Sequence, residues 1–113
     1  MNEIKWYTSN PPTTISPDTL LLVTLSTIVN TEKGIEHTVK TYPAMLKFEG
    51  NVAIWTIIDE NDSFTIKCDY ETPLHHGIDI EETDENINNE RTFTKEIRMI
   101  LAWAHMPTPH AYY

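Results

Sequence analysis

Residues 63–70, with the sequence SFTIKCDY, alternate polar and apolar side chains without a break. The apolar set consists of Phe64, Ile66, Cys68 and Tyr70. Successive side chains of a β-strand point to opposite faces, so this pattern predicts an antiparallel strand with one buried and one solvated face. Such a strand requires partner strands, and the partner strands that the chain can supply limit the folds that it can adopt.

Two further strands are predicted upstream, joined by a turn at residues 30–34. Residues 19–30 are rich in β-branched and apolar side chains, which predicts a central strand. Its inward face is formed by Leu21, Val23, Leu25 and Val29. The next segment, residues 35–42, alternates so that Ile35, His37 and Val39 are expected to point inward. The two segments together predict a hairpin.

Residues 52–58 predict another strand around Trp55, whereas the last apolar segment is ambiguous. In that segment, residues 96–106, a strand would place Ile97, Met99, Leu101 and Trp103 on one face. A helix would instead align Ile97, Ile100, Leu101 and Ala104, with Thr94 as a candidate N-cap. Periodicity alone does not choose between these alternatives.

Two segments carry no strand pattern. Residues 1–19 contain three prolines among small polar residues, which predicts an extended lead-in. Residues 72–92 contain a run of acids without a base from Asp79 to Glu90, which predicts a long acidic loop. The expected fold is a single domain over residues 1–113, mainly β, with a small antiparallel sheet of about five strands. The helix alternative for residues 96–106 leaves an α+β fold open.

Composition narrows the functional classes. With 113 residues, 40% of them hydrophobic, the chain is expected to fold as one globular domain. The start of the chain lacks an apolar signal segment, no apolar run is long enough for a bilayer, and the single Cys68 cannot form an internal disulfide. We therefore expect a cytoplasmic protein without a membrane segment. A net charge of −9 disfavours direct binding to nucleic acid and favours basic partners.

The ends and the middle of the chain carry a distinctive order of motifs. IKWYTSNPP places a tryptophan before prolines, GNVAIW places one after a turn, and ILAWAHMPTP ends in Met-Pro-x-Pro. This order resembles a family of small phage and prophage proteins named domain of unknown function 551, although residues 79–90 resemble an insertion. The resemblance implies that residues 97–105 form the closing strand, that Trp103 packs in the core and that the MPTP segment lies over the sheet. It implies no activity.

No catalytic, metal or cofactor signature is present. The candidate soft ligands are Cys68 and the five histidines, His37, His75, His76, His105 and His110. None of them follows a zinc-binding spacing, and the chain has neither a glycine-rich phosphate loop nor a nucleophile elbow. We therefore predict that the protein is not an enzyme and that it uses no metal or cofactor.

Two sets of residues are candidates for binding. The acidic set consists of Asp79, Glu81, Glu82, Asp84, Glu85 and Glu90, and it is the predicted contact with a basic partner. Its carboxylates would replace the phosphates of nucleic acid in charge-assisted hydrogen bonds to Lys and Arg. The aromatic set consists of Trp6, Tyr7, Tyr42, Trp55 and Trp103, and it would line a pocket for a flat ligand.

These sets lead to three functional hypotheses. The preferred one is a non-enzymatic phage or prophage accessory protein that inhibits a host macromolecule, such as a nucleic-acid-handling defence protein, by acidic mimicry. The second is a protein that sequesters a nucleotide signal in the aromatic pocket. The third is a structural component of the virion.

Overall fold

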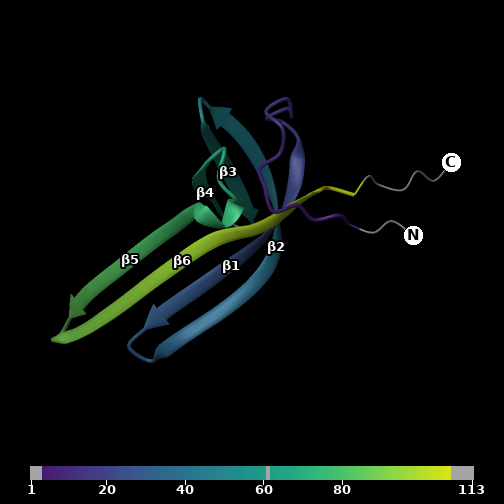
Figure 1. Ribbon diagram of the computed structural model, residues 1–113. Helices are drawn as coiled ribbons and strands as arrows, with labels where there is room; N and C mark the ends of the chain where they lie inside the picture. The colour runs from purple at the N-terminus through teal and green to yellow at the C-terminus, as the bar shows by residue number, and fades with distance from the viewer. Residues whose placement is uncertain (1–3, 61, 108–113) are drawn as a thin grey trace.

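The computed structural model describes residues 4–60 and 62–107, which form a single antiparallel sheet (Figure 1). Six strands lie in the order β4-β3-β2-β1-β6-β5, and neighbouring strands are hydrogen bonded. The elements are β1 (Leu20–Thr31), β2 (Gly34–Glu49), β3 (Val52–Asp59), β4 (Asp62–Asp69), the 3₁₀ turn η1 (Leu74–His76), β5 (Ile78–Ile87) and β6 (Glu90–His105). The mainly β prediction is confirmed, with six strands in place of about five.

The additional strand comes from the segment that was predicted to be an acidic loop. Ile78–Ile87 forms β5 and pairs with β6 over its whole length, so the loop prediction for residues 72–92 is wrong beyond η1 and the residue that follows it. Asn88 and Asn89 have φ angles of 54° and 65° and close a tight hairpin, as asparagines do in two-residue turns. The acidic run obscured an underlying alternation, and cations on β6 offset part of its charge.

β6 is a strand, and a bulge explains why its sequence also fitted a helix. Thr24 pairs with Ala102, but the next residue of β1, Leu25, pairs with Ile100, so Leu101 is left between the two pairs. The extra residue reverses which positions face the core. Ile100 and Trp103 are therefore both buried, and the predicted single face of odd-numbered residues is interrupted at Leu101.

The core lies on one face of the curled half of the sheet, which we call the body (Figure 1). Its buried members come from the five strands β1, β2, β3, β4 and β6 and from η1: Leu21, Val23, Leu25, Ala44, Leu46, Ala53, Trp55, Ile57, Ile66, Cys68, Leu74, Ile100 and Trp103. The curl brings the first residues of β5 against β4, where a Cβ added to Gly77 would lie 2.4 Å from Cβ of Cys68. The predicted inward faces are confirmed for Leu21, Val23 and Leu25 of β1 and for Ile66 and Cys68 of β4, whereas Val29 lies beyond this core.

The described part of the lead-in closes one end of this core. The Tyr7 and Trp103 backbones exchange two hydrogen bonds of 2.8 Å, and the Trp103 indole donates to the Ser9 carbonyl. Asn10 accepts a hydrogen bond from the Trp55 indole at 3.2 Å, and its amide nitrogen donates to the carbonyl of Tyr70. The lead-in is irregular, as predicted, and its polar groups satisfy the two buried indoles. The predicted MPTP cover includes residues 108 and 109, which lie outside the described residues.

The other halves of β1, β2 and β6 extend beyond the core and, with the whole of β5, form a four-stranded sheet, which we call the arm (Figure 1). The arm comprises residues 26–31, 34–40, 78–87 and 90–99. The prediction that Ile35, His37 and Val39 point into a core is wrong, because these side chains are exposed, Ile35 to 69%. The strands continue past the end of the body, so alternation in this segment has no second layer to cover it.

The Glu32 carboxylate connects the two hairpin ends of the arm, and we expect its pKa to be lowered. Hydrogen bonds from the backbone amides of Phe93 and of Glu32 itself lower the pKa of Glu32. Because the folded pKa lies below the ordinary value, the stabilising contribution is present above that value and is lost as the pH falls through the lowered pKa. NMR titration should place the Glu32 midpoint below the ordinary glutamate value of 4.5, and Glu32→Gln should remove this component of acid destabilisation. An ordinary midpoint would contradict the contact.

Candidate functional site

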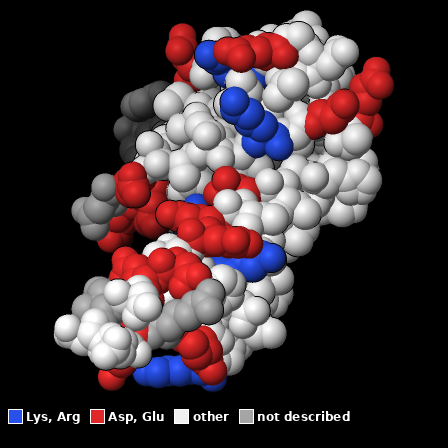
Figure 2. All heavy atoms as spheres, turned by 90° about the vertical axis from the view of Figure 1, so that its left-hand side faces the viewer, with Lys and Arg blue, Asp and Glu red and all other residues white. Residues whose placement is uncertain are grey.

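The candidate site is β5, an edge strand that pairs only with β6 along its length. Its ten residues include five acids and no lysine or arginine. Figure 2, which views the side of the molecule that carries β5, shows acidic side chains concentrated over its lower half. An edge strand leaves one row of backbone N–H and C=O groups unpaired, so a partner can approach this strand through its backbone as well as its charges.

Alternation along β5 separates the acidic set between the two faces of the arm. Asp79 and Glu81 lie opposite Arg98 and Glu96 of β6, on the inner face toward which β4 folds. Glu82 lies on the outer face, where it forms an ion pair of 3.6 Å with its cross-strand neighbour Lys95. The acidic set therefore presents carboxylates to both sides of one sheet edge.

Arg98 organises the inner group of carboxylates. Its guanidinium donates to the carboxylates of Asp79 at 3.0 Å, Glu96 at 2.9 Å and Glu81 at 3.3 Å, and it lies 4.5 Å from the centre of the Phe64 ring. Burial disfavours the charged guanidinium, but Glu96 and Asp79 outweigh that effect and raise the pKa of Arg98. One cation serves three carboxylates, so this cluster keeps two negative charges while holding β5 against β6.

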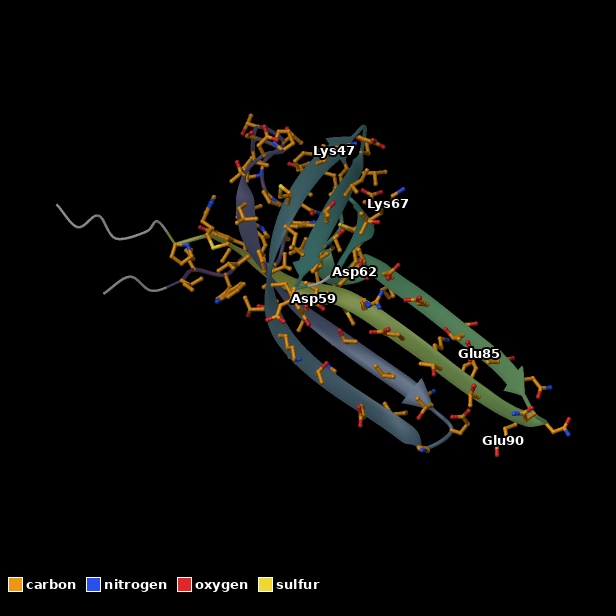
Figure 3. The ribbon with its side chains drawn as sticks, turned by 180° about the vertical axis from the view of Figure 1, so that it is seen from behind. Lys47, Asp59, Asp62, Lys67, Glu85 and Glu90 are labelled. Carbon is orange, nitrogen blue, oxygen red and sulfur yellow. The ribbon has the colours of Figure 1, made fainter. Side chains whose placement is uncertain are left out.

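The remaining members of the acidic set lie toward the end of the arm. Figure 3 shows Glu85 near the end of β5 and Glu90 at the start of β6, both far from the body. Their side chains are exposed. Asp84 is also exposed and lies opposite Phe93 on the outer face. The structure thus arranges all six predicted acidic residues along one continuous edge and its hairpin.

The aromatic set does not form a single pocket. Trp55 and Trp103 are core residues whose indoles are hydrogen bonded to the lead-in. Tyr7 stacks on Trp103 with ring centres 4.8 Å apart, whereas Trp6 is 38% exposed. Tyr42 lies elsewhere, in a cleft at the base of the arm. The structure unites only Tyr7 and Trp103, and it gives both tryptophans of the core a structural role.

This cleft was not predicted from the sequence, because the cleft exists only where the body curls over the arm. It has a volume of about 290 Å³, and a second hollow of about 580 Å³ shares Tyr42 and Asp59 with it. The lining residues of the first are Leu25, Thr27, Val29, Thr38, Tyr42, Asp59, Asp62, Phe64, Glu96 and Arg98. The Arg98 guanidinium in this cleft already donates to carboxylates. The turn that carries Asp59 and Asp62 adds negative charge at the rim of the cleft (Figure 3). The cleft extends the acidic character of the site.

The described residues form neither a metal-binding cluster nor a reactive thiol site. Among them, no three histidine, cysteine or acidic side chains are placed to hold an ion. Burial raises the pKa of the Cys68 thiol, which is close to Asn10 in the core and is therefore held in its unreactive protonated form. His75 and His76 are exposed neighbours in η1, and His110 lies outside the described residues.

Comparison of the chain with protein-family models, with curated proteins and with solved structures found no match. Within the described residues, no helix has the length and apolar character needed to cross a membrane.

Proposed function

We propose that the protein is a non-enzymatic binding protein that docks a basic partner protein along the acidic edge of β5. The observation that carries the proposal is the placement of an acidic, base-free strand at an unpaired sheet edge. An edge strand supplies backbone donors and acceptors for an added strand or loop, and its carboxylates supply charge-assisted hydrogen bonds to Lys and Arg. The two kinds of contact act on the same surface.

The spacing of the carboxylates supports a partner that ordinarily binds nucleic acid. A strand rises about 3.4 Å per residue, and each strand of DNA places one phosphate per about 3.4 Å of helix axis. Glu81, Glu82, Asp84 and Glu85 place a carboxylate at four of five consecutive positions. A groove of lysines and arginines that accepts a phosphate backbone would meet a linear row of carboxylates along β5, whose charge Arg98 and Lys95 offset only in part.

The finer hypothesis follows from this partner class and from the resemblance to domain of unknown function 551. The protein would be a phage or prophage accessory protein in the cytoplasm of a bacterial host. It would occupy the nucleic-acid groove of a host defence protein and inhibit it. In favour of this hypothesis are the charge of the edge and the order of the tryptophan and proline motifs at the two ends of the chain.

A charge-neutral variant of the edge tests the proposed function. Glu82→Gln/Glu85→Gln/Glu90→Gln removes three exposed charges and leaves the Arg98 cluster intact. The tagged protein is incubated with nuclease-treated bacterial lysate at low and at physiological salt, and captured proteins are identified by mass spectrometry. We expect the wild type to retain a basic nucleic-acid-binding protein that added DNA displaces. The triple variant should retain at least tenfold less of that protein than the wild type does.

A matched control separates edge charge from total charge. Asp18→Asn/Glu60→Gln/Glu71→Gln removes the same number of exposed charges from the body, and it should bind as the wild type does. Because screening weakens exposed charge pairs, retention should also fall between low and physiological salt. Equal retention by both triple variants would refute docking at β5, as would retention that DNA leaves unchanged.

A further inference from the structure

The outer face of the arm, next to the acidic edge of β5, is largely an apolar surface. Cross-strand partners share a face, and the register sets three rows across all four strands. One row is Val39, Ser26, Met99 and Ile78, and the next is His37, Ile28, Ile97 and Ile80. A third row, Ile35, Asn30, Lys95 and Glu82, completes the patch, which we call the outer patch.

Nothing in the described part of the chain covers the outer patch. Ile35 is 69% exposed and Ile80 is 54% exposed, and Val39 and Ile78 are exposed as well. The inner face differs, because β4 folds over its base and Phe64 contacts Arg98. Monomeric proteins rarely expose a contiguous apolar patch larger than a few hundred Å², and patches of that size commonly mark interaction sites.

The charges of the outer patch indicate which partner fits it. Its only acid and only base among the described side chains, Glu82 and Lys95, form an ion pair, so the patch is neutral within a chain of net charge −9. Its buried polar group is also satisfied, because the Ser26 hydroxyl and the His37 ring are 2.7 Å apart. A basic partner gains nothing from a neutral surface, whereas two copies of this chain can pair there without bringing like charges of the two patches into contact.

We propose that two copies of the chain pack their outer patches face to face, as the two sheets of a β-sandwich do. Four strands about 4.8 Å apart and three rows about 6.8 Å apart give a footprint of about 400 Å² per copy. Two copies would bury on the order of 800 Å², which is below the about 1,200–2,000 Å² of stable specific interfaces and typical of weak ones. We therefore expect a weak dimer that leaves both β5 edges accessible.

Sedimentation equilibrium from about 1 to 200 μM tests the dimer. Ile35→Lys/Ile80→Lys places two charges in the outer patch while reducing the net negative charge, so general repulsion between copies falls. We expect the wild type to dimerise and this variant to remain monomeric, a loss of at least tenfold in association. Raising the salt concentration should strengthen the dimer by screening the net charge, whereas it weakens docking at β5.

The control places the same charges on the same two strands but on the inner face. Thr38 and Thr83 are exposed there, and Thr38→Lys/Thr83→Lys should dimerise as the wild type does. Circular dichroism confirms that each variant is folded. A wild type that is monomeric at 200 μM overturns the proposal, and so does an Ile35→Lys/Ile80→Lys variant that still dimerises. Equal loss in the Thr38→Lys/Thr83→Lys variant would place the interface elsewhere. The proposed docking to a basic partner survives any of these results.

Discussion

Replacing Trp55 with alanine is expected to lower the free energy of unfolding by about 3–5 kcal/mol. Trp55 is completely buried at the centre of the body, and its indole donates to Asn10 of the lead-in. The substitution removes a large apolar side chain, leaves a cavity and releases a contact that closes the end of the core. Because a domain of this size is stable by only about 5–15 kcal/mol, the loss is a substantial fraction of the total.

Trp6→Ala is the matched control for this prediction, since it removes the same side chain from an exposed position. We expect it to change the free energy of unfolding by less than about 1 kcal/mol. Urea unfolding followed by circular dichroism measures both variants without relying on tryptophan fluorescence. A Trp55→Ala variant as stable as Trp6→Ala would mean that the core is not built around Trp55, and the packing of the body described above would be wrong.

Replacing Arg98 with alanine is expected to lower the free energy of unfolding by about 2–3 kcal/mol and to loosen β5 first. The Arg98 side chain is only 16% exposed and hydrogen bonds to three carboxylates on two strands. Without it, Asp79, Glu81 and Glu96 repel one another across the β5–β6 pair. Hydrogen exchange should show the amides of β5 losing protection before those of β1 and β3.

Restoring charge balance tests whether repulsion causes this loss. Adding Asp79→Asn and Glu81→Gln to Arg98→Ala should recover at least half of the lost stability, although each of these two substitutions alone should destabilise the wild type. The coupling appears in a double-mutant cycle as a non-additive term. Additive losses would show that Arg98 acts only through its packing against Phe64, and the carboxylate cluster would then contribute nothing to holding the edge strand.

The fate of the acidic segment shows how charge can hide a strand. Isoleucines and acids alternate at residues 78–81, which is a strand pattern, but the run of like charges favoured a loop because neighbouring carboxylates repel. The repulsion is offset by Arg98 and Lys95, which lie 19 residues from Asp79 and 13 residues from Glu82 in sequence and directly across the strand pair in space. The six acidic residues lie together along β5 and its hairpin, and their placement at a sheet edge was not predicted.

Local alternation in the sequence by itself determined that this chain forms an antiparallel sheet, that β1 and β4 have the inward faces observed in the body and that the candidate acidic residues are contiguous. Those properties depend on side chains within a few residues of one another. The tertiary structure alone decided that Ile35 and Val39 extend past the core as an arm, because burial depends on whether a second layer exists. It also decided that Trp55 and Trp103 are used by the core and the lead-in rather than by a ligand. The bulge at Leu101 had the same origin, since the register of β6 is set by its partner β1 and reverses the burial pattern that alternation predicts.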